Sequence, residues 1–191
     1  SAGAKTTLVL GTGVATLYYS CANHSGMGGQ INTNSTAGAS NFNGSIQATT
    51  KASTTYGFSA VSYTGNNSTS TVGHGLNAVP RWVIVKSRSA DSPTGWMVKH
   101  SSLQSNYNLA LNLTDTAWNP ATNGWVGDLT SSTTFSLVNG SSNGNNVNQS
   151  NVTYIAYCWS EVPGFSKFDS YSGGTNPKTI TTGFKPKFVI I

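Results

Sequence analysis

The sequence predicts an all-β protein, an antiparallel sandwich or jelly-roll-like domain. Charged residues make up only 8% of the chain, well below the roughly 25% usual for soluble domains. Aromatic residues stay at 10%, whereas disordered chains are poor in aromatic and β-branched residues. Short β-rich runs alternate with Gly, Asn and Ser turns, and no run shows a convincing helical pattern. The chain should therefore fold, and it should fold as strands.

Strand signals begin near the N-terminus, at 6–10 and 14–19. The polar stretch 28–55 indicates a linker with at most an edge strand around 45–48. Six further runs are typical of strands: 57–63, 81–87, 95–100, 108–113, 133–138 and 152–159.

Two of these runs carry more detailed expectations. Alternation in 81–87 puts Trp82, Ile84 and Lys86 on one face and the two valines on the other, so this strand should be central and buried on both sides. Alternation in 109–113 puts three leucines on one face.

Part of the chain is repeated. A Phe-Ser start at 58, a Tyr-x-Gly at 63–65, a Gly at 75 and a Pro-basic-aromatic strand at 80–85 return at 165–191, about 107 positions further on. The second copy stops inside its Val-Ile-Ile strand. We therefore expect a window on a longer tandem array, divided into a linker at 34–56, a β-sandwich repeat at 57–162 and the start of a second, truncated copy at 163–191.

Charge and hydropathy argue against two classes of partner. The net charge is +5, but the Lys and Arg residues are scattered, whereas nucleic-acid binding requires a clustered basic patch with stacking aromatics. No run approaches the roughly 18 apolar residues of a membrane span. We expect neither nucleic-acid binding nor membrane insertion.

Several motifs together resemble a β-rich module of tail-fibre and other virion proteins of marine tailed phages, cyanophages among them. The resemblance covers about residues 40–191. It implies a structural or receptor-binding role on a virion appendage, with no site residues to carry over. The motifs are Tyr-Thr-Gly-Asn at 63–66, Thr-Val-Gly-His-Gly-Leu at 71–76, Val-Ile-Val-Lys at 83–86, Tyr-Ile-Ala-Tyr-Cys at 154–158 and Pro-Gly-Phe-Ser-Lys-Phe at 163–168.

A second resemblance concerns residues 17–29, which look like the ligand loop of a cupredoxin and make 1–33 the C-terminal part of a cupredoxin-like module. The resemblance implies Cys21 as thiolate, His24 as imidazole and Met27 as weak axial ligand of copper. The usual first histidine has no counterpart in residues 1–20. Three interpretations stay open: a copper site, a cupredoxin-like loop kept for packing, and an unrelated loop. No cofactor is expected, and copper is the one candidate.

Catalysis is not expected. The chain has five carboxylates, and most of them lie in turn-like contexts where solvated aspartates are ordinary. A Gly-x-Ser-x-Gly match at 140–144 lacks the helix that follows a nucleophile elbow. His74 lies between two glycines, which indicates a tight turn more than a catalytic group. Cys158 is expected to be a buried free thiol rather than the disulfide partner of Cys21.

Binding to a surface ligand requires fewer specific residues than catalysis does. Trp96, Trp118, Trp125 and Asp128 lie near polar residues in or beside long connections, which is where binding sites usually reside. They suit a glycan platform, and the tryptophans equally suit caps on the core of the sandwich.

These observations predict a non-catalytic structural and receptor-binding segment of a phage tail fibre or other virion appendage. We expect other virion proteins, a host-surface glycan or protein, and further copies of the chain as partners, a trimer being one option. The alternatives are a cellular surface adhesin or filament-forming protein and, third, a copper-binding cupredoxin.

Overall fold

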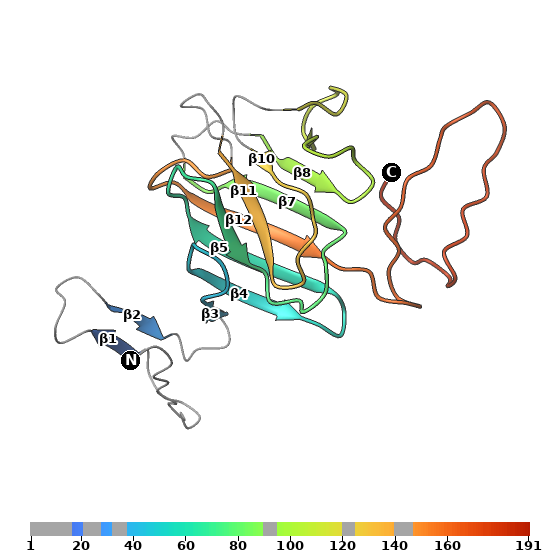
Figure 1. Cartoon of the computed structure of the whole chain (residues 1–191). Coiled ribbons are helices and arrows are strands. Elements are labelled where there is room, and N and C mark those ends of the chain that lie inside the picture. The colour runs from blue at the N-terminus through green and yellow to red at the C-terminus, as the bar shows by residue number, and fades with distance from the viewer. Residues whose placement is uncertain (1–16, 21–27, 32–37, 90–94, 120–124, 140–146) are drawn as a thin grey trace.

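The computed structural model describes residues 17–20, 28–31, 38–89, 95–119, 125–139 and 147–191. These residues form strands and no helix (Figure 1), so none of them belongs to a helix that could cross a membrane. The strands are β1 Leu17–Ser20, β2 Gly28–Ile31, β3 Ala39–Asn41, β4 Ala48–Ser53, β5 Phe58–Thr64, β6 Ser70–Gly73, β7 Trp82–Ser87, β8 Met97–His100, β9 Leu109–Ala110, β10 Trp125–Val126, β11 Thr134–Val138 and β12 Thr153–Trp159.

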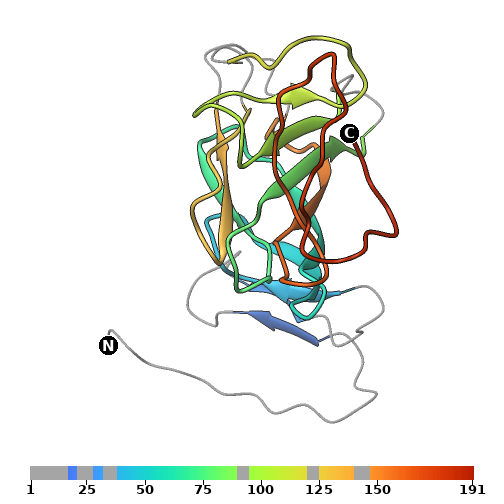
Figure 2. The same cartoon turned by 90° about the vertical axis from the view of Figure 1, so that its right-hand side faces the viewer.

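Two antiparallel sheets pack face to face, which confirms the predicted all-β sandwich. The larger sheet has seven strands in the order β3-β4-β5-β12-β7-β8-β9, and the smaller has three in the order β10-β11-β6. Figure 2 shows the two layers edge-on, with β11 lying beside the larger sheet. Strands β1 and β2 form a separate hairpin.

The core lies between the two sheets. On β12 every second side chain points inward, so Tyr154, Ala156 and Cys158 are buried. Phe135 and Leu137 of β11 meet them from the smaller sheet. Burying a large apolar side chain contributes about 1.5–3 kcal/mol, so this seam is a major source of stability.

Most predicted strands are found within one or two residues of their expected bounds. Strand β7 lies between β12 and β8, and Val83 and Val85 face the core. Ile84 is also buried, on the opposite face. The central position predicted for this strand is therefore confirmed.

The expected linker at 34–56 differs in the structure, since β3 and β4 belong to the large sheet. Ala48 and Thr50 of β4 point inward and are buried. The sequence did not predict this strand, because its inward residues are small or polar and give only a weak apolar pattern.

The predicted leucine face at 109–113 is wrong. Strand β9 ends at Ala110, and a turn follows in which the Leu113 N–H donates to the Ala110 carbonyl. The buried residue is Ala110, whereas Leu111 and Leu113 are 55% and 53% exposed. A turn after two residues breaks the alternation on which the prediction rested.

Residues 160–191, which contain the second copy, form no strand. They extend from the end of β12 as long loops beside the sandwich (Figures 1 and 2). We call residues 163–191 the C-terminal segment.

Candidate functional site

The outer face of the large sheet carries four aromatic rings, from Phe58, Trp82, Tyr157 and Trp159. Trp159 on β12 is paired with Phe58 on β5 and with Trp82 on β7. All four alternate with the inward-facing residues of their strands, so they point away from the smaller sheet. We call these four residues the aromatic surface.

Two pairs of rings in the aromatic surface are stacked, and the other contacts between its rings are tilted. The centroids of Trp82 and Trp159 are 4.6 Å apart with planes inclined by 25°, and Phe58 and Tyr157 are stacked at 6.4 Å and 12°. The first separation nearly equals the 4.7–4.9 Å or so between neighbouring strands, so these two rings stand side by side and present their edges outward. Sugar binding requires free ring faces, so this surface suits an apolar protein contact better than a glycan.

The C-terminal segment lies against one end of this surface. The ring of Phe168 is 6.3 Å from that of Trp82, and Phe165 lies 5.3 Å from Tyr56. The Phe168 N–H donates to Oε2 of Glu161, at 3.1 Å. The first residues of the repeated copy therefore contact the sandwich from which they extend.

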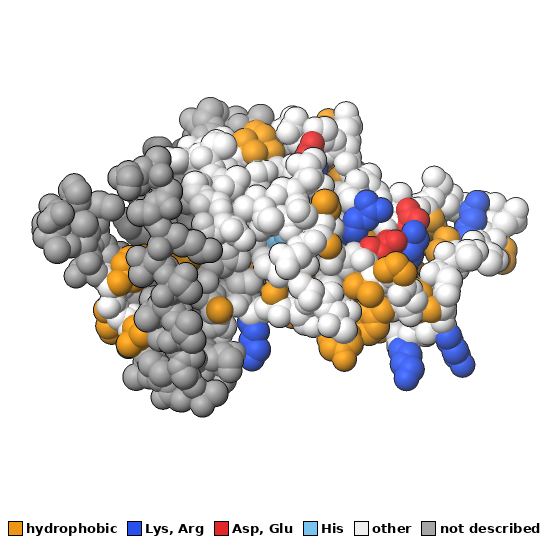
Figure 3. All heavy atoms as spheres, turned by 60° about the horizontal axis from the view of Figure 1, so that its bottom comes forward, with side chains coloured by type: hydrophobic (Ala, Val, Ile, Leu, Met, Phe, Trp, Pro, Cys, Tyr) orange, Lys and Arg blue, Asp and Glu red, His pale blue; other side chains and the backbone are white. Residues whose placement is uncertain are grey.

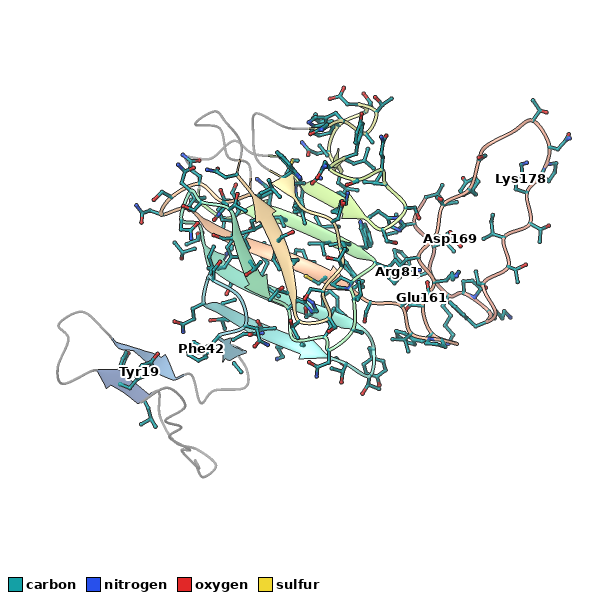
Figure 4. The ribbon with its side chains drawn as sticks, viewed as in Figure 1. Tyr19, Phe42, Arg81, Glu161, Asp169 and Lys178 are labelled. Atoms are coloured by element: carbon teal, nitrogen blue, oxygen red, sulfur yellow. The ribbon has the colours of Figure 1, made fainter. Side chains whose placement is uncertain are left out.

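Charges gather at the same place. Lys167 Nζ lies 3.5 Å from Glu161 Oε1 and 3.7 Å from Asp169 Oδ2. Figure 3 shows acidic and basic side chains next to hydrophobic ones on the side from which the C-terminal segment extends. Figure 4 shows Arg81, Glu161 and Asp169 near one another there, far from Phe42.

These charges influence one another. The pKa of Asp169 is lowered, first by the hydrogen bond from the Ser170 N–H and then by Lys167 and Arg81. Half-burial lowers the pKa of His100, and Arg81 lowers it further while Asp169 opposes both effects. Arg81, just before β7, and His100 on β8 thus lie within electrostatic reach of Asp169 in the C-terminal segment.

The three candidate glycan-binding tryptophans lie on different elements, and no ring contact joins them within the described residues. Trp118 packs against the core, and the indole N–H of Trp125 on β10 is buried without an acceptor in the described structure. Trp96, just before β8, is 37% exposed. These positions favour the core-cap interpretation for Trp118 and Trp125 and leave Trp96 as the accessible ring.

The carboxylate of Asp128 is bonded to two side chains of the protein itself. Its Oδ1 lies 2.7 Å from Nζ of Lys99, and its Oδ2 accepts a hydrogen bond from the Ser105 hydroxyl. These hydrogen bonds, that of Lys99 first, lower the pKa of Asp128. The carboxylate is engaged within the protein rather than directed at a ligand.

The proposed copper ligands Cys21, His24 and Met27 lie outside the described residues, between β1 and β2. In the part of the chain that the structure describes, no three His, Cys, Asp or Glu side chains are grouped to hold a metal ion. Stoichiometric copper with an intense visible band that disappears in Cys21→Ser would identify a copper site.

The remaining candidates for chemistry are structural or undescribed. His74 is buried, its Nδ1 accepts the Leu76 N–H, and burial lowers its pKa. Cys158 is a buried free thiol, as predicted, and burial raises its pKa to about 12. The Gly-x-Ser-x-Gly match at 140–144 lies outside the described residues.

Fold and site together define a β-sandwich domain with an aromatic surface on its larger sheet. A family model described as "Domain of unknown function (DUF7483)" matches residues 30–191, and the chain belongs to this family. The matched range includes β3, β4 and the C-terminal segment along with the sandwich. No curated protein and no solved structure matches the chain.

Proposed function

We propose that the chain is a non-catalytic structural module of a phage tail fibre or other virion appendage, and that it contributes to host attachment. In this role similar sandwiches follow one another along an extended protein that assembles with other virion proteins and with further copies of itself. The proposal begins from the sequence resemblance to virion modules.

The tandem arrangement is supported by a match in backbone conformation between the two copies. Gly57 and Gly75 of the first copy have φ values of +64° and +70°. Gly164 and Gly183, at the corresponding places in the second copy, have +76° and +81°. Left-handed backbone favours glycine, so the repeat extends from sequence to local geometry even where no strands form.

Attachment is assigned to the end of the sandwich near β8 and β10, where Trp96 is exposed. Connections on a rigid β-scaffold are favourable places for recognition, because the scaffold positions them at little entropic cost. Host glycans or proteins are the expected ligands. The aromatic surface is assigned instead to contacts within the assembly, since the stacked rings of Trp82 and Trp159 cover one face of each other.

Adsorption to host cells tests the attachment role. The purified chain should compete with virus particles of its source for adsorption, and Trp96→Ala should weaken that competition. Phe42→Ala removes an exposed ring that lies outside both surfaces, next to β3, and serves as the matched control. Competition that is absent, or unchanged in Trp96→Ala, would remove this end of the sandwich from host recognition.

A further inference from the structure

We propose that Phe168 has two mutually exclusive positions, and that its exchange between them covers or uncovers Trp82, at one end of the aromatic surface. In one position it lies on Trp82, as in this structure. In the other it lies in the core of a second sandwich that residues 165–191 begin. This inference rests on the tandem arrangement of the proposed function.

The first position is the one described above. Phe168 is half-buried, its ring contacts Trp82, and its N–H is held by Glu161. Lys167 joins Glu161 and Asp169 on either side of it. Hydrogen bond, ion pairs and ring contact all fix the segment at the end of the aromatic surface.

The second position follows from the repeat. Phe-Ser-Lys-Phe at 165–168 corresponds without a gap to Phe-Ser-Ala-Val at 58–61, and each run follows a glycine with positive φ. Val61, the counterpart of Phe168, faces the core of β5 and is 0% exposed. A strand at 165–171 with the phase of β5 would therefore turn Phe168 into a core, away from Trp82.

The sheet order explains why the first position prevails here. Strands β5 and β7 do not pair with each other, because both pair with β12, which lies between them. The C-terminal segment has counterparts of β5 and β7, and the described residues after Trp159 form no strand to lie between them. A central strand would supply hydrogen-bond partners for the counterparts of β5 and β7. Full burial of Phe168 in a core would then stabilise it more than its half-burial against Trp82 does.

Exchange has a consequence for assembly. When Phe168 leaves, the ring of Trp82 is uncovered, and it stands beside the stacked ring of Trp159. Such a surface fits an apolar surface of the neighbouring copy of the module, because the repeat places that copy next in the chain. Folding of one module would thus prepare a contact surface on the module before it.

A tandem chain tests the exchange: residues 86–162 are repeated after Ile191, which supplies counterparts of β8 to β12. Hydroxyl-radical labelling measures the accessibility of Trp82, normalised to Trp96, and amide hydrogen exchange reports strands at 165–171 and 186–191. In the 191-residue chain, Phe168→Ala should raise Trp82 labelling severalfold, and the matched control Phe42→Ala, at an exposed ring near β3, should leave it unchanged.

In the tandem chain, Trp82 should be labelled as strongly as in Phe168→Ala, with protected amides at 165–171. Protected amides together with a Trp82 that still responds to Phe168→Ala would overturn the exchange and leave the tandem arrangement standing. Unprotected amides at both 165–171 and 186–191 would overturn the tandem arrangement, and the exchange with it.

Discussion

Lys99 and Asp128 form an ion pair with Nζ and Oδ1 2.7 Å apart, and the lysine side chain is only 2% exposed. Lys99 belongs to β8 of the large sheet, and Asp128 follows β10 of the small one. Nζ also donates to the carbonyls of Gln104 and Tyr107, at 3.1 Å each. One buried cation therefore joins the two sheets and the connection after β8.

Removal of this carboxylate should destabilise the fold. Asp128→Ala leaves a buried ammonium with two carbonyl partners, and we expect a loss of about 1–2 kcal/mol, moderated because Asp128 is 39% exposed. Asp115→Ala, at an exposed aspartate, should change stability little. Urea unfolding measures both, and equal effects would show that the ion pair contributes nothing specific.

Stability should fall on mild acidification because of His74. Burial lowers the pKa of His74 in the folded protein, whereas the unfolded chain titrates near 6.5 or so. Below about pH 6.5 the unfolded state therefore binds more protons than the folded state. The contribution of neutral His74 to the free energy of unfolding is complete above that pH and is lost as the pH falls toward the folded pKa. His74→Asn should flatten the pH dependence of the unfolding free energy between about pH 7 and 5 relative to the wild type. A slope that does not change would contradict this assignment.

Gly57 and Gly164 should respond differently to the same substitution. Both have positive φ, but a Cβ at Gly57 meets the Ser160 carbonyl and lies 2.8 Å from Val162, whereas nothing lies within 4 Å of one at Gly164. Gly57→Ala should cost both backbone strain and a clash, and exceed Gly164→Ala by about 1 kcal/mol or more. Thermal unfolding of the two variants checks the order, and a larger loss for Gly164→Ala would be inconsistent with the structure.

The Cys158 thiol should be inert in the folded protein. It is buried, and its pKa of about 12 leaves almost no thiolate at neutral pH. In a Cys21→Ser background, a thiol reagent should react with Cys158 only after unfolding. Rapid reaction of the native protein would mean that β12 opens locally.

Much of the large sheet could be predicted, because β5, β7 and β12 are runs of β-branched and aromatic residues with turns on either side. Strands β3 and β4 of this sheet and β6 of the smaller sheet could not. They contain one large apolar residue between them, Val72, and so give too weak an apolar pattern. At β9 the turn after Ala110 decided the structure, and the leucine alternation did not.

The candidate site was less accessible to sequence reasoning. Trp82, Phe58 and Trp159 lie far apart in the sequence, and only the pairing of β12 with both β5 and β7 brings their rings together. Alternation along 153–159 could have predicted that Tyr157 and Trp159 share the outer face of their strand. The pairing of Asp128 with Lys99 had no such signal, because it depends on how β10 lies over β8.

Immunogold electron microscopy of the native source, with an antibody raised against residues 57–160, tests the central claim most directly. A module of a virion appendage predicts label on the tail tips or fibres of virus particles. Label along filaments or on the envelope of intact cells would contradict the virion assignment and identify a cellular surface protein.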